Sequence, residues 1–422
     1  MLEFNPPVHG TWNIVHIGML MPECHQIYVC ALNCMRGVVL TAAEMGASDR
    51  FSYVLLKEKD ILNGTVEEVT IEGTIDVIRR LPQRPKAVAL FTVCTHQFLG
   101  CDLPRIYAKV REALPDIDVI EAYMDPINQK EGPTPDQKLR RAMHRVLRSQ
   151  KVDINKCALI GSNVPVSPSS ELSRLLKEAG MTLAETPNCP SYEEFVRMGE
   201  AAFFLSVVPN GRQAARETAE RLGRPHLHLP MSFDLDEIGA ELLSLTQLLK
   251  ALGRKGLGDG EVRSFLSEER QKAERALAEA LDIVGERPIA IDYTVHPRPV
   301  GLALCLLGAG FRVERLYLNA VSSEEEEVFV KLMSTENPPE ILTVNHPGDR
   351  IAQREGRETL AIGQQAAWRE GTVHFVNMVE GGSLHGFWGI REMARLMQEA
   401  VLTEKDPEDL LPRKGLGCDC CL

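Results

Sequence analysis

The sequence lacks any apolar run approaching the roughly 20 residues of a membrane-spanning helix, so we expect no membrane partner. It also lacks a block of Lys and Arg, and its 422 residues carry a formal net charge of −12. Nucleic acids attract clustered positive charge, so this balance also predicts no nucleic-acid partner. The first residues, MLEFNPPVHG, do not follow the basic and then apolar pattern of a signal peptide, and we expect a cytoplasmic protein.

Two further absences concern chemistry and organisation. No segment has the spacing of a phosphate-binding loop, Gly followed after four residues by Gly-Lys-Ser or Gly-Lys-Thr, so any ATP must be hydrolysed by another protein. No short repeat or low-complexity segment occurs either. The composition, 44% hydrophobic and 25% charged, is typical of a globular protein with sizeable cores. A chain of this length predicts two to three domains.

One pattern recurs along the chain: an apolar run typical of a strand, a loop with small residues, and an amphipathic helix. For example, KAVALFTV leads through CTHQFLGCD into LPRIYAKVREAL. Such alternation predicts an α/β protein with parallel sheets flanked by helices. Breaks near residue 150 and at KALGRKGLGDGE divide the chain into three α/β domains and a tail. The predicted ranges are 1–150, 151–255, 256–405 and 406–422.

Loops that follow the carboxyl ends of parallel strands are where ligands gather in such proteins. The polar candidates in these loops are His96, His296, Arg298, His346, Arg350 and His385. Each of them is alternatively a surface or packing residue. His96 follows Cys94 by two residues and is a candidate cluster neighbour or proton donor. We name His96 and His385 as the catalytic candidates.

Eleven cysteines are many for a chain expected in a reducing compartment, and they indicate metal or redox chemistry. Five of them form two groups in the first hundred residues: Cys24, Cys30, Cys34, Cys94 and Cys101. The spacing of the first three matches neither a zinc finger nor a ferredoxin. If a helix begins near Val29, Cys30 and Cys34 share one helix face, either as metal ligands or as core residues.

Cys94 directly follows a buried strand, and Cys101 stands at the start of the next helix, where the helix dipole favours a thiolate. At the other end of the chain, the tail GLGCDCCL contains Cys418, Cys420 and Cys421. This tail is either a metal-binding or redox arm, or a disordered end with exposed thiols. The residues alone do not decide between these interpretations.

The run VHIGMLMPECHQIYV and the later stretch from KEKDILNG to CTHQFLGCDL resemble the N-terminal domain of nitrogenase component 1 proteins. Cys24 and Cys94 stand at the places of that family's cluster cysteines. CALIGSNVPVSPSSELSRLLKEAGM is similar to the family's middle domain, and GGSLHGFWGIREMARLM to its closing helix. The resemblance spans about residues 9–400 and implies three Rossmann-like domains around a shared cofactor site.

The resemblance also implies a cofactor and partners. It implies an iron–sulfur cluster, of the 4Fe–4S type or larger, held by Cys24, Cys30, Cys34, Cys94 and Cys101, with Cys418, Cys420 and Cys421 as further metal candidates. It implies an ATP-dependent iron protein as electron donor, and a homodimer or a heteromer with a similar subunit. IAIDYTVHPRPVG lacks the Cys that anchors the iron–molybdenum cofactor in catalytic family members, so we expect neither that cofactor nor N2 as substrate.

Three functions remain open on the sequence. We interpret the chain first as a nitrogenase-like oxidoreductase component that reduces an unidentified substrate. The alternative is a scaffold or carrier for metallocluster assembly without turnover. The third is an α/β binding protein without redox chemistry, in which the cysteines are structural.

Overall fold

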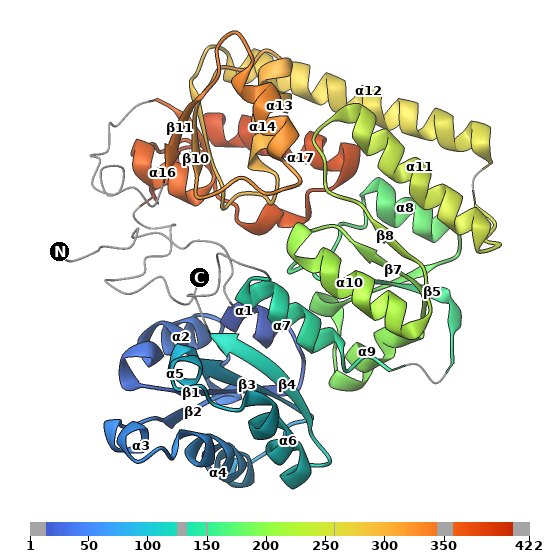
Figure 1. Ribbon diagram of the computed structural model, residues 1–422. Coiled ribbons are helices and arrows are strands. Elements are labelled where there is room, and N and C mark those ends of the chain that lie inside the picture. The colour runs from blue at the N-terminus through green and yellow to red at the C-terminus, as the bar shows by residue number, and fades with distance from the viewer. Residues whose placement is uncertain (1–13, 125–132, 149–150, 257, 344–357, 408–422) are drawn as a thin grey trace.

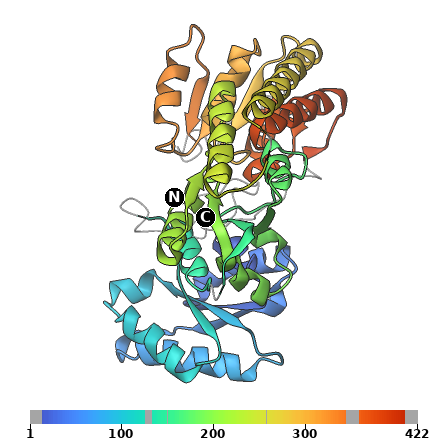
Figure 2. The same ribbon diagram turned by 90° about the vertical axis from the view of Figure 1, so that its right-hand side faces the viewer.

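The computed structural model describes residues 14–124, 133–148, 151–256, 258–343 and 358–407 (Figure 1). Three parallel sheets, each flanked by helices, confirm the predicted α/β fold class. Figures 1 and 2 show the N-terminal domain at one end, the C-terminal domain at the other, and the middle domain in contact with both. Within the described residues, no helix is both long and apolar enough to span a membrane.

The N-terminal sheet has the spatial order β2-β1-β3-β4. Its strands are β1 (Cys24–Cys30), β2 (Phe51–Leu55), β3 (Ala87–Val93) and β4 (Asp118–Met124). Strands β1 and β3 are buried at every residue because helices cover both faces of the sheet. One face packs on α1 (Ile14–Met19), α2 (Leu32–Glu44) and α7 (Pro135–His144). The other packs on α4 (Val66–Arg80) and α6 (Leu103–Ala113), and the short α3 (Glu58–Leu62) and α5 (Cys94–Phe98) follow β2 and β3.

The middle sheet has the order β6-β5-β7-β8. Its strands are β5 (Asp153–Leu159), β6 (Thr182–Glu185), β7 (Ala201–Ser206) and β8 (His226–His228), with helices α8 (Glu171–Glu178), α9 (Tyr192–Val196), α10 (Pro209–Leu222) and α11 (Leu235–Ala251). A Cβ on Gly161 would lie 2.3 Å from the Cα of Gly211. The turn after β5 therefore touches the backbone at the start of α10, which only a pair of glycines permits.

The C-terminal sheet has the order β11-β10-β9-β12-β13. Its strands are β9 (Ile289–Asp292), β10 (Val313–Leu318), β11 (Glu340–Thr343), β12 (Leu360–Ile362) and β13 (Phe375–Val376). Its helices are α13 (Pro299–Gly308), α14 (Glu326–Met333), α16 (Gln364–Glu370), α17 (Gly386–Leu402) and the long α12 (Asp259–Val284), which runs along α17. One apolar core joins this domain to the middle domain, and a second joins the middle and N-terminal domains.

In each sheet the strand order reverses beside the first strand, between β1 and β3, β5 and β7, and β9 and β12. The connections on the two sides of such a switch point diverge and leave a crevice at the carboxyl ends of the strands. The helix considered from Val29 does not form there. Val29 and Cys30 belong to β1, and α2 begins only at Leu32, because β1 is held between two neighbouring strands.

Candidate functional site

Three cysteines meet at the switch point of the N-terminal sheet. Cys30 is the last residue of β1, and Cys94 directly follows Val93, the last residue of β3. Tyr28 pairs with Phe91, so Cys30 lies level with Val93 on a strand about 4.8 Å away. Cys34 lies in the first turn of α2, and burial and then the Cys94 thiolate raise the pKa of Cys34. We call Cys30, Cys34 and Cys94 the thiol edge.

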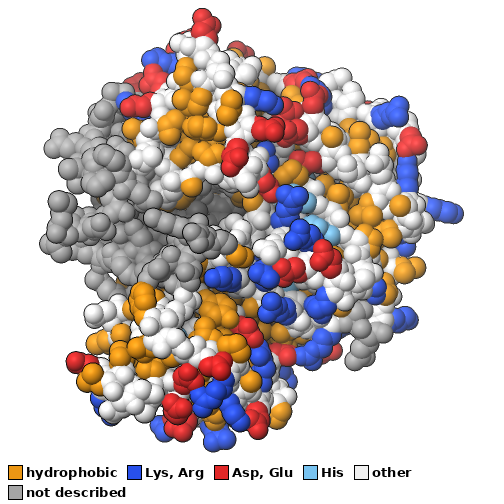
Figure 3. Space-filling model, viewed as in Figure 1, with side chains coloured by type: hydrophobic (Ala, Val, Ile, Leu, Met, Phe, Trp, Pro, Cys, Tyr) orange, Lys and Arg blue, Asp and Glu red, His pale blue; other side chains and the backbone are white. Residues whose placement is uncertain are grey.

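The thiol edge is partly open to solvent. Cys30 is buried with its Sγ 3.0 Å from Sδ of Met35, whereas Cys34 and Cys94 are half-buried. The helices that follow β1, β2 and β3 carry large exposed hydrophobic side chains: Leu32 at 67%, Leu62 at 77% and Phe98 at 72%. Figure 3 shows hydrophobic side chains on the surface of this domain, in the lower part of the view. An apolar surface next to half-buried thiols suits burial against another chain.

Cys24 lies at the opposite end of the sheet from Cys94. It is the first residue of β1 and pairs with Ala87, the first residue of β3. Because a strand rises about 3.3 Å per residue, roughly 20 Å of β3 separate its level from Cys94. Burial raises the pKa of the Cys24 thiol to about 12, which keeps it protonated in the core. The prediction that Cys24 and Cys94 of one chain share a cluster is therefore wrong.

Cys101 is also separate from the thiol edge. Its N–H donates to the carbonyl of His96 at 2.9 Å, and its side chain packs on the core between the sheet and α4 and α6. Cys30 and Cys34 pack on the other face. Burial and then the Glu67 carboxylate raise the pKa of Cys101. Of the five predicted ligands, Cys30, Cys34 and Cys94 thus lie near the carboxyl ends of β1 and β3, whereas Cys24 and Cys101 do not.

His96 is completely buried, and both of its ring nitrogens are in use. Its Nδ1 accepts from the N–H of Val93 at 3.2 Å, and its Nε2 lies 2.9 Å from Oγ1 of Thr70. The Thr70 hydroxyl donates to the carbonyl of Val66 at 2.7 Å, so the His96 Nε2 carries the hydrogen. Burial lowers the pKa of His96 to about 4. This histidine fixes α5 on α4, which corrects its assignment as a proton donor.

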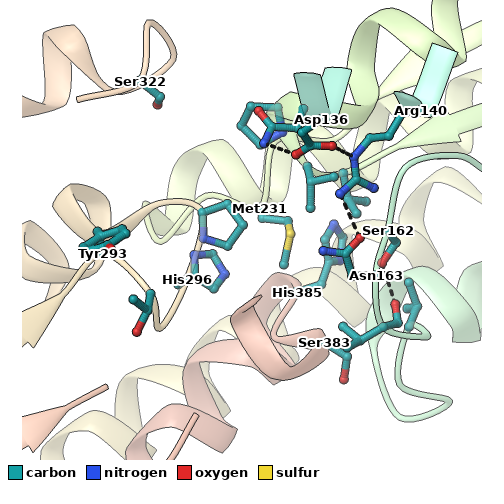
Figure 4. Close-up of a pocket in the computed structure, with 18 residues that line it drawn as sticks. Asp136, Arg140, Ser162, Asn163, Met231, Tyr293, His296, Ser322, Ser383 and His385 are labelled. Carbon is teal, nitrogen blue, oxygen red and sulfur yellow. Dashed lines mark hydrogen bonds and ion pairs between the residues drawn. The ribbon is translucent and has the colours of Figure 1, made fainter. Parts of the chain in front are cut away.

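A cavity of about 200 Å³ lies between the middle and C-terminal domains. Its walls come from α7 and from the loops after β5, β7, β8, β9, β10 and β13, so the carboxyl ends of the two sheets face it from opposite sides. The lining side chains that Figure 4 labels are Asp136, Arg140, Ser162, Asn163, Met231, Tyr293, His296, Ser322, Ser383 and His385. Ser322 lies across the cavity from Ser162 and Asn163 (Figure 4).

A neutralised charge pair forms one wall. Arg140 of α7 is buried, and its Nε donates to the Asp136 carboxylate one helical turn earlier. Its other nitrogens donate to the carbonyl of Gly161 and, at 2.8 Å, to Oδ1 of Asn163. The side-chain amide of Asn210 donates to the second Asp136 oxygen at 2.7 Å. Because Asp136 neutralises the buried Arg140 and the hydrogen bonds of both are satisfied, this pair presents little net charge to the cavity.

Two neutral histidines form the facing wall. His296 accepts from the N–H of Arg298 at 3.0 Å through Nδ1, so its Nε2–H faces the carbonyl of Leu384 at 3.4 Å. His385 is 3% exposed, and neither of its ring nitrogens has a hydrogen-bond partner in the described part of the chain. Burial lowers the pKa of His296 to about 3 and that of His385 to about 4.

The position of His385 is set by the middle domain. His385 precedes α17, and the N–H of Trp388 donates to Oε2 of Glu171 on α8 at 3.1 Å. A Cβ on Gly386 would lie 2.5 Å from that carboxylate oxygen, and Gly386 has a φ of 68°. The glycine therefore lets the buried carboxylate approach the start of α17, which fixes the turn that carries His385.

Backbone strain also gathers at this cavity. Three non-glycine residues of the described segments have a clearly positive φ: Glu23 at 52°, Met231 at 56° and Ser383 at 65°. Two of them, Met231 and Ser383, line the cavity. Such conformations persist where the surrounding structure requires them, and they cluster at binding sites.

The remaining predicted residues are placed as follows. Arg298 does not line the cavity: its Nη1 lies 3.3 Å from the carbonyl of Pro230, near Glu324 and Glu325. His346, Arg350, Cys418, Cys420 and Cys421 lie outside the described residues. In the described segments, no three His, Cys, Asp or Glu side chains are close enough to bind a single metal ion.

Sequence reasoning missed Asp136, Arg140 and Asn163. Asn163 follows the strand KCALIGS, so its place in the loop was a usable signal. Arg140 belongs to the charged run QKLRRAMHRVLRSQ, where nothing distinguishes a buried arginine from its exposed neighbours. Only the docking of α7 between two domains reveals it.

These features define a class of protein: three doubly wound α/β domains, with thiols at the switch point of the first sheet and a cavity between the second and third domains. The family model for nitrogenase component 1 type oxidoreductases matches residues 17–407, and the chain belongs to this family. Proteins of the family bind metal clusters of the iron–sulfur type and assemble with similar subunits and an iron protein. The predicted resemblance is thereby confirmed.

Solved structures agree on the fold. A chain of "Nitrogenase Cp1 at pH 6.5" superposes with a TM-score of 0.69 at 12% identity, over 95% of this chain and 94% of that chain. A chain of "Nitrogenase Cp1 at pH 5" gives a TM-score of 0.62 at 11% identity, over 93% of this chain and 89% of that chain. No curated protein sequence matches this chain. At such identities the likeness concerns the fold alone.

Proposed function

We propose that this chain is the cluster-binding component of a cytoplasmic, nitrogenase-like reductase that acts on a substrate other than N2. The convergence of Cys30, Cys34 and Cys94 at a switch point is the observation that carries the proposal. The electron donor is a separate ATP-dependent iron protein, because the sequence has no phosphate-binding loop of its own. The substrate takes up these electrons together with protons in the cavity between the middle and C-terminal domains.

The donor set of the thiol edge fits an iron–sulfur cluster shared between chains. Thiolate sulfur is the usual ligand of such clusters, and a four-iron cluster takes four thiolates, whereas one chain offers three here. A second copy, docked on the apolar surface around Leu32 and Phe98, brings three more thiols, so that two copies offer six, enough for a four-iron cluster or a larger one; a similar subunit with at least one thiol would also complete the four. When bound, the cluster supplies one-electron storage at low potential.

The residues of the cavity have distinct roles in this proposal. Arg140 and Asp136 hold the loops after β5 and β7 together and keep the site neutral. His385 offers one ring nitrogen as donor and one as acceptor, and we propose that it holds or passes a proton at the substrate. His296 has both nitrogens occupied and orients the loop after β9.

Metal analysis of anaerobically purified protein tests the cluster. We expect iron and acid-labile sulfide in the native protein and loss of most of the iron in Cys94→Ser. Cys24→Ser is the matched control, because Cys24 lies in the core at the far end of the sheet, and it should retain the iron. Iron-free native protein, or equal iron in the two variants, would contradict the proposal.

A carrier that hands over a cluster without turnover is the second candidate. The half-buried state of Cys34 and Cys94 favours it, because incoming thiolates of an acceptor protein can reach them. Cluster-loaded protein would then pass iron and sulfide to an apo-protein acceptor and remain inactive with the cognate iron protein. Substrate reduction driven by the iron protein and ATP, without cluster loss, identifies the reductase.

A further inference from the structure

The cavity between the middle and C-terminal domains selects its ligand by size, charge and hydrogen bonding, and these three properties define a chemical class. The volume of about 200 Å³ is below the roughly 300–1,000 Å³ of pockets that hold drug-sized ligands. A macrocycle does not fit in it. The ligand is therefore a small molecule of a few non-hydrogen atoms.

The charge of the walls excludes ions. Asp136 and Arg140 neutralise each other, and the hydrogen bonds of Asn163 and Asn210 hold this pair together. Both histidines are neutral because burial disfavours the imidazolium. An anion or a cation that entered would lose part of its hydration without gaining a counter-charge from the described lining residues, which is costly.

The unpartnered polar atoms show what the ligand must offer. A neutral imidazole has one N–H donor and one acceptor nitrogen, and His385 uses neither within the described chain. The buried hydroxyl of Ser322, on another wall, also lacks a partner there. Native proteins rarely leave such groups unsatisfied, so a ligand or water completes them. Val166, Val207 and Met231 supply the apolar contacts.

We propose that this cavity binds a small neutral molecule with a short apolar body and one polar end that both donates and accepts hydrogen bonds, as an amide or an alcohol does. The polar end bonds to His385, and the body lies against the valines and Met231. This deepens the proposed function, on which it rests for the role of the ligand as substrate. The positive φ of Met231 and Ser383 marks the two loops that hold the ligand in place.

Three probes of the same shape and different charge test the class: acetamide, acetate and acetamidinium. Saturation-transfer NMR on the purified full-length protein measures their binding. We expect acetamide to bind at least tenfold more tightly than either ion. Equal or tighter binding of acetate or acetamidinium, or no binding of acetamide at any concentration up to 100-fold above that of the protein, would overturn the proposal.

Variants locate the site. His385→Phe should weaken acetamide binding at least tenfold, whereas His385→Gln keeps a donor and an acceptor and should restore most of it. His374→Phe is the matched control, because His374 lies beside α17 outside the cavity, and should leave binding unchanged. If His385→Phe fails to fold, Val166→Phe fills the cavity from another wall and should weaken binding as strongly. Unchanged binding in both variants contradicts the proposal.

The outcome is distinguishable from a failure of the proposed function. Acetamide binding depends on the cavity formed by α7 and the middle and C-terminal domains, whereas iron content depends on the thiols at the ends of β1 and β3. Iron-free protein that still prefers acetamide would reject the cluster and keep the ligand class. Iron-loaded protein that prefers acetate would keep the cluster and reject the ligand class.

Discussion

At the scale of single residues, burial decides the chemistry of each thiol and each carboxyl group. Cys24 and Cys157 lie in the core, where burial raises the pKa of each to about 12. Cys94 is half-buried at the end of a strand, where a reagent or a metal can reach it. The same residue type is therefore a small hydrophobic side chain in one place and a candidate ligand in another.

Alkylation should separate these two kinds of cysteine. In metal-free native protein at pH 8, we expect iodoacetamide to modify Cys34 and Cys94, and Cys24 and Cys157 to react only after unfolding, because the reactive thiolate is absent from the core. Peptide mass spectrometry over time measures the four rates. Modification of Cys24 as fast as that of Cys94 would contradict the placement of these thiols.

Glu171 should make stability depend on pH. Burial raises its pKa to about 7, whereas an unfolded chain has a glutamate pKa of about 4.3. The folded state therefore binds a proton more tightly than the unfolded state does. The stability that this adds is complete below about pH 4.3 and is lost as the pH rises through 7. The native protein should lose free energy of unfolding between pH 5 and pH 8, and Glu171→Gln should remove up to about 3 kcal/mol of that loss.

Urea denaturation at the two pH values measures this difference. Glu178→Gln, at an exposed position on the same helix, is the control and should keep the pH dependence of the native protein. A Glu171→Gln variant with the native pH dependence would show that this carboxyl group titrates normally in the fold.

At the scale of elements, short turns at the carboxyl ends of the strands place the functional groups. Arg140 lies on α7, whose first turn is closed by reciprocal hydrogen bonds between Thr134 and Gln137. That start fixes where the helix meets the turn after β5. In the same region, α10 approaches this turn so closely that glycine is needed on both sides, at Gly161 and Gly211.

Gly211→Ala tests this approach. The added Cβ would lie 2.7 Å from the Cα of Gly161 and 2.9 Å from the carbonyl oxygen of Ile160, so α10 must move away. We expect a loss of about 1–3 kcal/mol in the free energy of unfolding, as is usual for overpacking, together with weaker ligand binding in the cavity.

The control is a glycine in a helix with open space around it. A Cβ on Gly239 in α11 meets no heavy atom within 4 Å, so Gly239→Ala should stabilise the protein by about 0.5–1 kcal/mol. Chemical denaturation compares both variants with the native chain. If the two substitutions change the stability alike, α10 does not lie as close to the turn as the structure places it.

At the scale of the whole molecule, two continuous cores join three domains, and exposed apolar side chains lie beside the thiol edge. The cores join the middle domain to both neighbours, and the cavity lies between the second and third sheets. The N-terminal sheet instead presents half-buried thiols beside exposed Leu32 and Phe98. In the proposed function, this surface is where a second chain docks on the thiol edge.

Assembly through this surface gives the last prediction. We expect cluster-loaded native protein to be a dimer, or a heteromer with a similar subunit, in anaerobic light scattering. Phe98→Asp should shift the cluster-loaded protein toward the monomer, because burying a carboxylate in an apolar interface is costly. Val330→Asp, at a similarly exposed position in the C-terminal domain, should not. A cluster-loaded monomer of the native chain would exclude the shared site.

The sequence by itself determined the fold class. Runs such as AVALFTV followed by small residues and an amphipathic helix can bury their apolar surface only as strand–helix units, so parallel sheets were predictable from local pattern. It also identified Cys94 and His385 as candidates, because each follows a strand, and Cys30 and Cys34 as neighbouring thiols that are either metal ligands or core residues.

Only the tertiary structure decided which candidates meet. Cys24 is close to Cys30 in the sequence, but a strand between them places them at opposite ends of the sheet, whereas parallel pairing of β1 and β3 puts distant Cys94 beside Cys30. His96 closes a short helix, and Arg140 is buried in a charged helix, because partners from other elements satisfy their polar atoms. Register and domain docking arise from contacts between distant segments, which no local pattern contains.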